Sequence, residues 1–129
     1  MLYNILIVDD SRTTRTVISK TLKLAGVPIN QLYEAENGKV ALDILDKSWV
    51  DLVLADINMP EMDGVEMIDH MSRDGLLKTI PVVIVSTEGS QTRIEEMRSK
   101  GVRAYVRKPF TPELIKNIVK DILGEKDAK

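Results

Sequence analysis

Cysteine is absent from the 129-residue chain. Its absence excludes disulfides, thiolate metal sites and a thiol nucleophile, and it suits a reducing cytosol. Histidine is almost absent as well, since His70 is the only one. A lone histidine needs other ligands before it can form a metal site, so we expect His70 to be a solvated surface residue.

A surplus of basic residues and a long apolar run are also missing. The 18 lysine and arginine residues face 20 acidic ones, which leaves a net charge of -2. Binding of nucleic acid through its phosphates needs the opposite balance. No stretch approaches the roughly 18 apolar residues of a membrane span, and no basic leader precedes the first apolar run. We expect a soluble, cytoplasmic protein that neither binds nucleic acid nor inserts into a membrane.

The chain does contain enough apolar sequence for one core. Hydrophobic residues make up 43% of it, and a chain of this length corresponds to one ordinary globular domain. We expect a single domain over residues 1–124 and a short polar C-terminal tail over residues 125–129.

Short apolar runs alternate with stretches that have helical spacing. The runs that read as strands are residues 4–8, 32–35, 51–56, 81–86 and 104–107. Each is followed by apolar residues spaced three or four apart, as in Ile18 and Leu22, which is typical of a helix with one buried face. The connections are too long for hairpins, so we predict an α/β fold: a doubly wound, five-stranded parallel sheet flanked by five helices. The preferred strand order is 2-1-3-4-5, the flavodoxin-like winding.

Three carboxylates lie at the ends of the first and third of these strands: Asp9, Asp10 and Asp56. In a sheet of this order, ligands bind at the carboxyl ends of these two strands. Neighbouring carboxylates repel one another, and a hard divalent cation such as Mg²⁺ binds such oxygen ligands. The alternative is that Asp9 or Asp10 only caps the next helix. Capping needs one carboxylate and leaves Asp56 unexplained, so we predict a magnesium site.

Two further kinds of polar group, a hydroxyl and an ammonium, are expected at the same edge of the sheet. Ser86 and Thr87 end the fourth strand, and Lys108 ends the fifth. Alone, Lys108 would be read as a surface lysine. A carboxylate nucleophile, a divalent cation, a hydroxyl and an ammonium group together form a complete set for phosphoryl transfer.

Four motifs in order, "DD", "DINMPEMDG", "VST" and "YVRKPF", resemble the receiver domain of two-component response regulators over nearly the whole chain. The resemblance implies that Asp56 is the phosphoacceptor, which takes a phosphoryl group from the phosphohistidine of a histidine kinase. It also implies that Asp9 and Asp10 hold Mg²⁺ together with Asp56 and the backbone carbonyl of Asn58.

The resemblance assigns roles to residues around the phosphoryl group as well. Ser86 matches the switch hydroxyl, Lys108 matches the lysine that pairs with the phosphoryl group, and Tyr105 matches the aromatic residue that changes rotamer on activation. Without the family, Tyr105 would be read as an ordinary half-buried strand residue. The Lys108–Pro109 bond is cis in the family. Residues implied to lie near the phosphate are Asn58, Thr87 and Glu88.

Only a few polar residues follow the last predicted helix, so we expect the output to be binding rather than a DNA-binding or enzymatic domain. The chain resembles the stand-alone, CheY-like chemotaxis type, whose phosphorylated form binds a flagellar switch protein. We expect a monomer that catalyses only its own phosphorylation and dephosphorylation. A phosphate sink or a phosphorelay intermediate outside chemotaxis is the alternative within the family.

Two other classes of protein are weaker alternatives. An FMN-binding carrier of the same fold needs phosphate-binding donors after the first strand, where this chain has two negative charges. A phosphatase with an aspartyl nucleophile would have that nucleophile on the first strand and a second aspartate two residues later, a spacing that "DDS" lacks.

Overall fold

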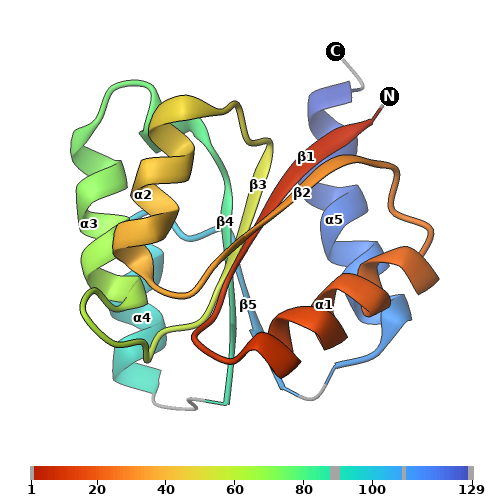
Figure 1. Ribbon diagram of the computed structural model, residues 1–129, viewed down its shortest axis with the longest axis horizontal. Helices are drawn as coiled ribbons and strands as arrows, with labels where there is room; N and C mark the ends of the chain where they lie inside the picture. Colours follow the sequence, from red (N-terminus) through yellow and green to blue (C-terminus); the bar gives the residue numbers. More distant parts are fainter. Residues whose placement is uncertain (1, 88–90, 109, 128–129) are drawn as a thin grey trace.

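The computed structural model describes residues 2–87, 91–108 and 110–127, with side chains described as far as residue 124. Within these ranges, strands and α-helices alternate along the chain (Figure 1). The strands are β1 (Tyr3–Val8), β2 (Ile29–Ala35), β3 (Leu52–Ala55), β4 (Val82–Ser86) and β5 (Ala104–Arg107). The helices are α1 (Arg12–Leu24), α2 (Gly38–Lys47), α3 (Gly64–Arg73), α4 (Gln91–Ser99), α5 (Pro112–Asp127) and a short 3₁₀-helix, η1 (Leu77–Thr79). Among the described residues, no helix combines the length and the apolar character needed to cross a membrane.

The strands form one parallel sheet in the order β2-β1-β3-β4-β5, which confirms the predicted fold. Helices α1 and α5 cover one face, and α2, α3 and α4 cover the other (Figure 1). Side chains of β1 alternate between the two cores: Ile5 and Ile7 pack on the α1/α5 side, and Leu6 and Val8 pack on the opposite side. Burial on both faces explains why β1 is an unbroken apolar run in the sequence.

The first turns of three helices are capped by side chains. Ser11, Asn37 and Asp63 accept hydrogen bonds from backbone N–H groups of α1, α2 and α3, respectively, and each such cap satisfies a donor that has no partner within its helix. At the other end, α1 stops just before Gly26, as the sequence predicts. Gly26 has a φ of 75°, a left-handed conformation that glycine adopts without strain.

Three features differ from the sequence-based expectation. β2 begins at Ile29 rather than at residue 32, because an edge strand is held by backbone pairing with β1 and its polar residues hide the apolar pattern. The sequence does not predict η1, since a single turn is too short for a helical repeat to be recognised. α5 continues to Asp127, so the boundary expected at residue 125 lies inside the helix. The residues there include Glu125 and Lys126, and both types are good helix formers.

Candidate functional site

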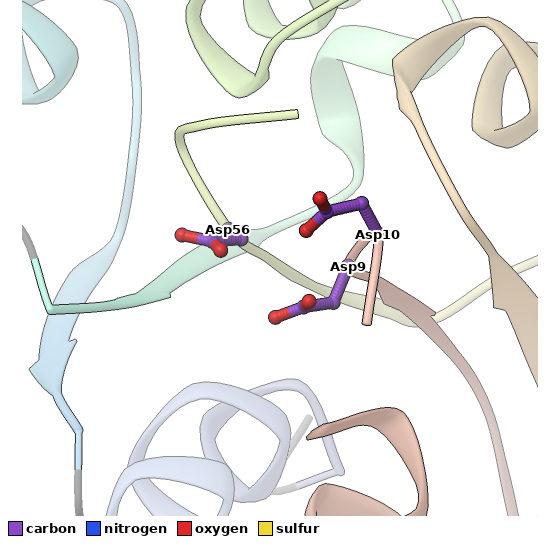
Figure 2. A group of neighbouring side chains, drawn as sticks. All are labelled: Asp9, Asp10 and Asp56. Carbon is purple, nitrogen blue, oxygen red and sulfur yellow. The ribbon is translucent and has the colours of Figure 1, made fainter. Parts of the chain in front are cut away.

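Asp9, Asp10 and Asp56 gather at the carboxyl ends of β1 and β3 (Figure 2). The register of the two strands brings them together, because Val8 pairs with Ala55 and the N–H of Asp56 donates to the carbonyl of Val8 at 2.9 Å. One carboxylate oxygen from each of the three aspartates lies within 4.8 Å of the others. The sheet therefore produces the acidic cluster that the sequence predicts.

The three carboxylates differ in environment. Asp9 is only 2% exposed, and its Oδ1 accepts a hydrogen bond from the N–H of Ser11 at 2.9 Å. Asp56 is half-buried, and its Oδ1 accepts from the N–H of Ile57 at 2.7 Å. Asp10 is exposed. Backbone donors thus hold the two inner carboxylates in place, and Asp10 lies where solvent reaches the cluster.

Lys108, which follows β5, reaches two of these carboxylates. Its Nζ donates to Oδ2 of Asp9 at 2.8 Å and to Oδ2 of Asp56 at 3.5 Å. The contacts join residues that are 99 and 52 positions apart in the chain. One ammonium group offsets only part of the charge of three carboxylates, so the cluster keeps a net negative charge when all three are ionised.

The donor chemistry of the cluster fits a hard divalent cation. Its ligands are carboxylate oxygens that converge within a few ångströms, the kind that magnesium and calcium prefer in proteins. Helix capping does not account for the cluster, because Ser11 is the N-cap of α1 and its Oγ accepts from the N–H of Thr14 at 3.2 Å. Asp9, Asp10 and Asp56 could therefore hold a metal ion.

The loop between β3 and α3 carries Asp56 and Asn58 and is closed tightly at its base. The N–H of Gly64 donates to the carbonyl of Ile57 at 2.7 Å. A Cβ atom at Gly64 would lie 2.4 Å from the carbonyl oxygen of Asp56, which is far inside contact distance. Only glycine allows this approach. Within the loop that this contact closes, Asn58 is exposed.

The residues assigned to switching lie at the adjacent strand ends. Ser86 is the last residue of β4 and is 1% exposed, whereas Thr87 is exposed. On β5, Tyr105 pairs with Ile84 and is half-buried against the core on the α2/α3/α4 side. Ile84 belongs to the same core, and strand side chains alternate, so Ser86 and Tyr105 share one face of the sheet.

Two of the residues predicted for the site fall outside the described part of the chain, and one residue at the site was not predicted. Glu88 and Pro109, and with Pro109 the expected cis bond, fall outside the described residues. His70 is exposed, as predicted. Sequence reasoning missed Arg15, which donates from Nη1 to the carbonyl of Asp9 at 2.7 Å and from Nε to Oε1 of Glu34 at 2.9 Å. No motif signals it, because an arginine in α1 reads as an ordinary helix residue.

Sequence comparison matches most of this chain to proteins of known family. A family model described as the response regulator receiver domain matches residues 5–120. A chemotaxis protein CheY homolog of Campylobacter jejuni is 37% identical over 121 residues, which cover 93% of this chain and 92% of the relative. Chemotaxis protein CheY1 of Helicobacter pylori is 36% identical over 124 residues, which cover 95% of this chain and 98% of the relative.

Solved structures agree with the sequence relatives. The chemotaxis response regulator CheY4 of Vibrio cholerae superimposes with a TM-score of 0.82 at 30% identity, covering 95% of this chain and 99% of the other. CheY-like response regulators are signalling proteins, and the matching family extends from β1 into α5. The chain therefore belongs to the receiver domain family of response regulators.

Proposed function

We propose that this protein is a phosphoacceptor response regulator: Asp56 takes a phosphoryl group from a histidine kinase, and the phosphorylated form signals by binding another protein. One observation carries the proposal. The carboxylate of Asp56 lies in a cluster with Asp9 and Asp10 and 3.5 Å from the ammonium group of Lys108. Transfer of a phosphoryl group to a carboxylate joins two anions, so it needs positive charge at this point.

In the proposed reaction, an oxygen of Asp56 attacks the phosphorus atom of a phosphohistidine. A phosphorus–oxygen bond forms as the phosphorus–nitrogen bond breaks, and the histidine nitrogen leaves with the electron pair and takes a proton from solvent. The N–H of Ile57 holds Oδ1 of Asp56 and so fixes the plane of the attacking carboxylate. Lys108 then pairs with an oxygen of the transferred group.

The residues proposed to hold Mg²⁺ are the three clustered aspartates, together with the backbone carbonyl of Asn58. When bound, the ion supplies positive charge that neutralises the phosphoryl oxygens. The chain itself keeps the ligands in position: Ser11 orients Asp9, and the closure between Ile57 and Gly64 holds the loop that contains Asn58.

Intact-mass measurement after incubation with acetyl phosphate and magnesium tests the proposed function. We expect the mass to rise by one phosphoryl group and to return to its starting value as the acyl phosphate hydrolyses. A protein that gains no phosphoryl group would overturn the proposal. Retention of FMN through gel filtration would favour the flavin-carrier alternative instead.

The names of the relatives bear on the pathway. Both sequence relatives described above are called chemotaxis proteins. We therefore propose that the phosphorylated form acts in the cytoplasm as a chemotaxis messenger whose partner is a flagellar switch component. A phosphate sink or a phosphorelay intermediate remains the second candidate, and the two differ in whether phosphorylation changes a surface remote from Asp56.

Magnesium is expected to stabilise the unphosphorylated protein. Relief of repulsion among the three carboxylates favours the folded state, since the ion binds the folded chain in preference to the unfolded one. Millimolar MgCl₂ should therefore raise the melting temperature of the parent protein. Asp10→Ala should lose most of this rise, whereas Asp46→Ala, which changes an exposed residue of α2, should keep it. A parent melting temperature that does not respond to magnesium would argue against the metal site.

Ser86 and Tyr105 give the proposed signal a route to the surface. Both lie on the α4 side of the sheet, and Ser86 is buried at the end of β4, beside the strand that leads to Asp56. If Ser86 turns toward a phosphoryl group on Asp56, the space beside β5 changes and Tyr105 can adopt another rotamer. Such a change shifts populations between two arrangements, and couplings of this kind are typically about 1–3 kcal/mol.

Beryllofluoride, a stable mimic of the aspartyl phosphate, tests this route. We expect it to shift amide NMR signals around Asp56 and also around Tyr105 and Ile94 in α4. In Ser86→Ala, the signals near Asp56 should still shift, but the remote ones should move much less because the hydroxyl is lost. A parent protein whose remote signals stay unchanged would favour the phosphate sink over the messenger.

A further inference from the structure

We propose that Asn37 and Glu61 form a latch that positions the β3–α3 loop for metal binding; the inference rests on the function proposed for the acidic cluster. Asn37 caps α2 through its Oδ1, which accepts from the N–H of Val40 at 2.9 Å. Its Nδ2 donates to Oε2 of Glu61 at 3.2 Å. Asn37 is 3% exposed, which puts it with Asp9 and Ser86 in the small group of buried polar residues that the described structure contains.

The backbone at the other end of the latch is strained. Glu61 has a φ of 62°, and it is the only non-glycine residue with a positive φ in the part of the chain that the structure describes. The N–H of Met62 donates to the carbonyl of Pro60 at 2.6 Å, so Glu61 is the central residue of a γ-turn, a rare and strained conformation. Strain of this kind persists only where surrounding contacts hold it, and the contact with Asn37 is one of these.

A second contact joins the same two segments. The N–H of Gly38 donates to the carbonyl of Met62 at 2.9 Å. A Cβ at Gly38 would lie 2.9 Å from Cγ of Met62, so the loop lies directly on the start of α2. The tip of the β3–α3 loop is therefore attached to α2 through both a side chain and the backbone.

The latch and two backbone hydrogen bonds together connect the segments that surround the acidic cluster. On one side, the N–H of Asp9 donates to the carbonyl of Ala35, two residues before Asn37, at 3.0 Å. On the other side, the N–H of Asp56 donates to the carbonyl of Val8. Asn58, whose carbonyl is the proposed metal ligand, lies between Asp56 and the latch. Opening the latch would remove one of the contacts that hold the segment containing Asn58, although no proposed ligand is changed.

Glu61→Gly separates this role from general stability. Glycine relieves the strained φ, which offsets the cost of taking the Glu61 acceptor away from Asn37, so we expect the variant to unfold at a temperature close to that of the parent. It also removes the carboxylate, so we expect magnesium, titrated by calorimetry, to bind about tenfold more weakly, the lower end of the effect seen for residues that orient metal ligands. If Glu61 had only a structural role, affinity would follow stability.

Two further variants separate the latch from a simple effect of charge. Glu61→Gln keeps an oxygen that can accept from Asn37 but loses a negative charge, and we expect an affinity close to that of the parent. Asn37→Asp keeps a good N-cap for α2 but faces Glu61 with a like charge, and we expect weaker binding although the site gains a negative charge. In the double variant, the amide at position 61 can donate to the carboxylate at position 37. The magnesium affinity should therefore return toward that of the parent. Long-range electrostatics alone predicts weaker binding for Glu61→Gln and tighter binding for Asn37→Asp, whereas the latch predicts little change for the first and weaker binding for the second.

Amide hydrogen exchange provides a readout that needs no metal. The Gly38 N–H, which donates to Met62, should exchange at least about tenfold faster in Glu61→Gly than in the parent, because a tenfold loss of affinity through opening requires the closed form to become a minor population. Parent-like exchange or parent-like magnesium affinity in this variant would overturn the latch. Failure of the parent to accept a phosphoryl group would instead overturn the proposed function, so the two failures are distinguishable.

Discussion

Asp56→Asn is expected to gain no phosphoryl group from acetyl phosphate in magnesium, under conditions in which the parent protein gains one. The amide has nearly the shape of the carboxylate and its oxygen can still accept from the N–H of Ile57, which donates to Oδ1 in the parent. It lacks the nucleophilic charge, however, and removal of the attacking group typically lowers a rate by roughly three orders of magnitude or more.

The matched control for this variant is Asp46→Asn, which makes the same chemical change at an exposed position of α2. It should be phosphorylated at the parent rate. Peptide mapping of the parent should place the modification on the segment that contains Asp56. Phosphorylation of Asp56→Asn at the parent rate, in the same magnesium concentration, would mean that another residue is the nucleophile.

The sequence was sufficient to predict which carboxylates meet, because their meeting depends on strand order. Asp9 and Asp56 each directly follow a buried apolar strand. The carboxyl ends of neighbouring parallel strands lie at one edge of the sheet. The alternation of strands and helices and the usual handedness of their connections predict a doubly wound parallel sheet, and the order 2-1-3-4-5 was the winding preferred among those that obey these rules. Side-chain detail was not required.

Contacts between loops could not be predicted in this way. The bond from Asn37 to Glu61 joins residues 24 positions apart, and Arg15 reaches a backbone carbonyl rather than a side chain. Neither pairing leaves a pattern in the sequence, since each depends on how two loops approach in space. The same reason explains why Lys108 could be expected at the edge of the sheet but not assigned to Asp9 as its nearer partner.

Lys108→Met is expected to destabilise the metal-free protein and to make its stability depend more strongly on magnesium. Methionine keeps much of the apolar stem but removes the ammonium group that contacts Asp9 at 2.8 Å and Asp56 at 3.5 Å. Asp9 is 2% exposed, so its carboxylate would be left buried beside two others. Removing one partner of a fully buried ion pair typically costs 3–5 kcal/mol. Because the side chain of Lys108 is 19% exposed, we expect a smaller loss, about 2 kcal/mol at neutral pH.

Lys100→Met is the matched control for Lys108→Met, because Lys100 also pairs with an aspartate but at the surface. Its Nζ lies 2.5 Å from Oδ1 of Asp69, with the two side chains 28% and 35% exposed. This hydrogen bond holds the pKa of Asp69 below its ordinary value, yet a pair that is partly exposed to solvent contributes less to stability than a buried one. Chemical denaturation should therefore find a clearly smaller loss for Lys100→Met, with no change in the response to magnesium.

The response to magnesium distinguishes the proposed role of Lys108 from simple packing. Without the ammonium group the cluster of carboxylates is more negative, so Lys108→Met should bind magnesium more tightly and gain more stability from it than the parent does. This is the opposite of the result expected for Asp10→Ala, which removes a ligand. The opposite result would be a free energy of unfolding for Lys108→Met that is the same with and without millimolar magnesium. Lys108 would then stabilise the protein by packing, and not by balancing the charge of the three carboxylates.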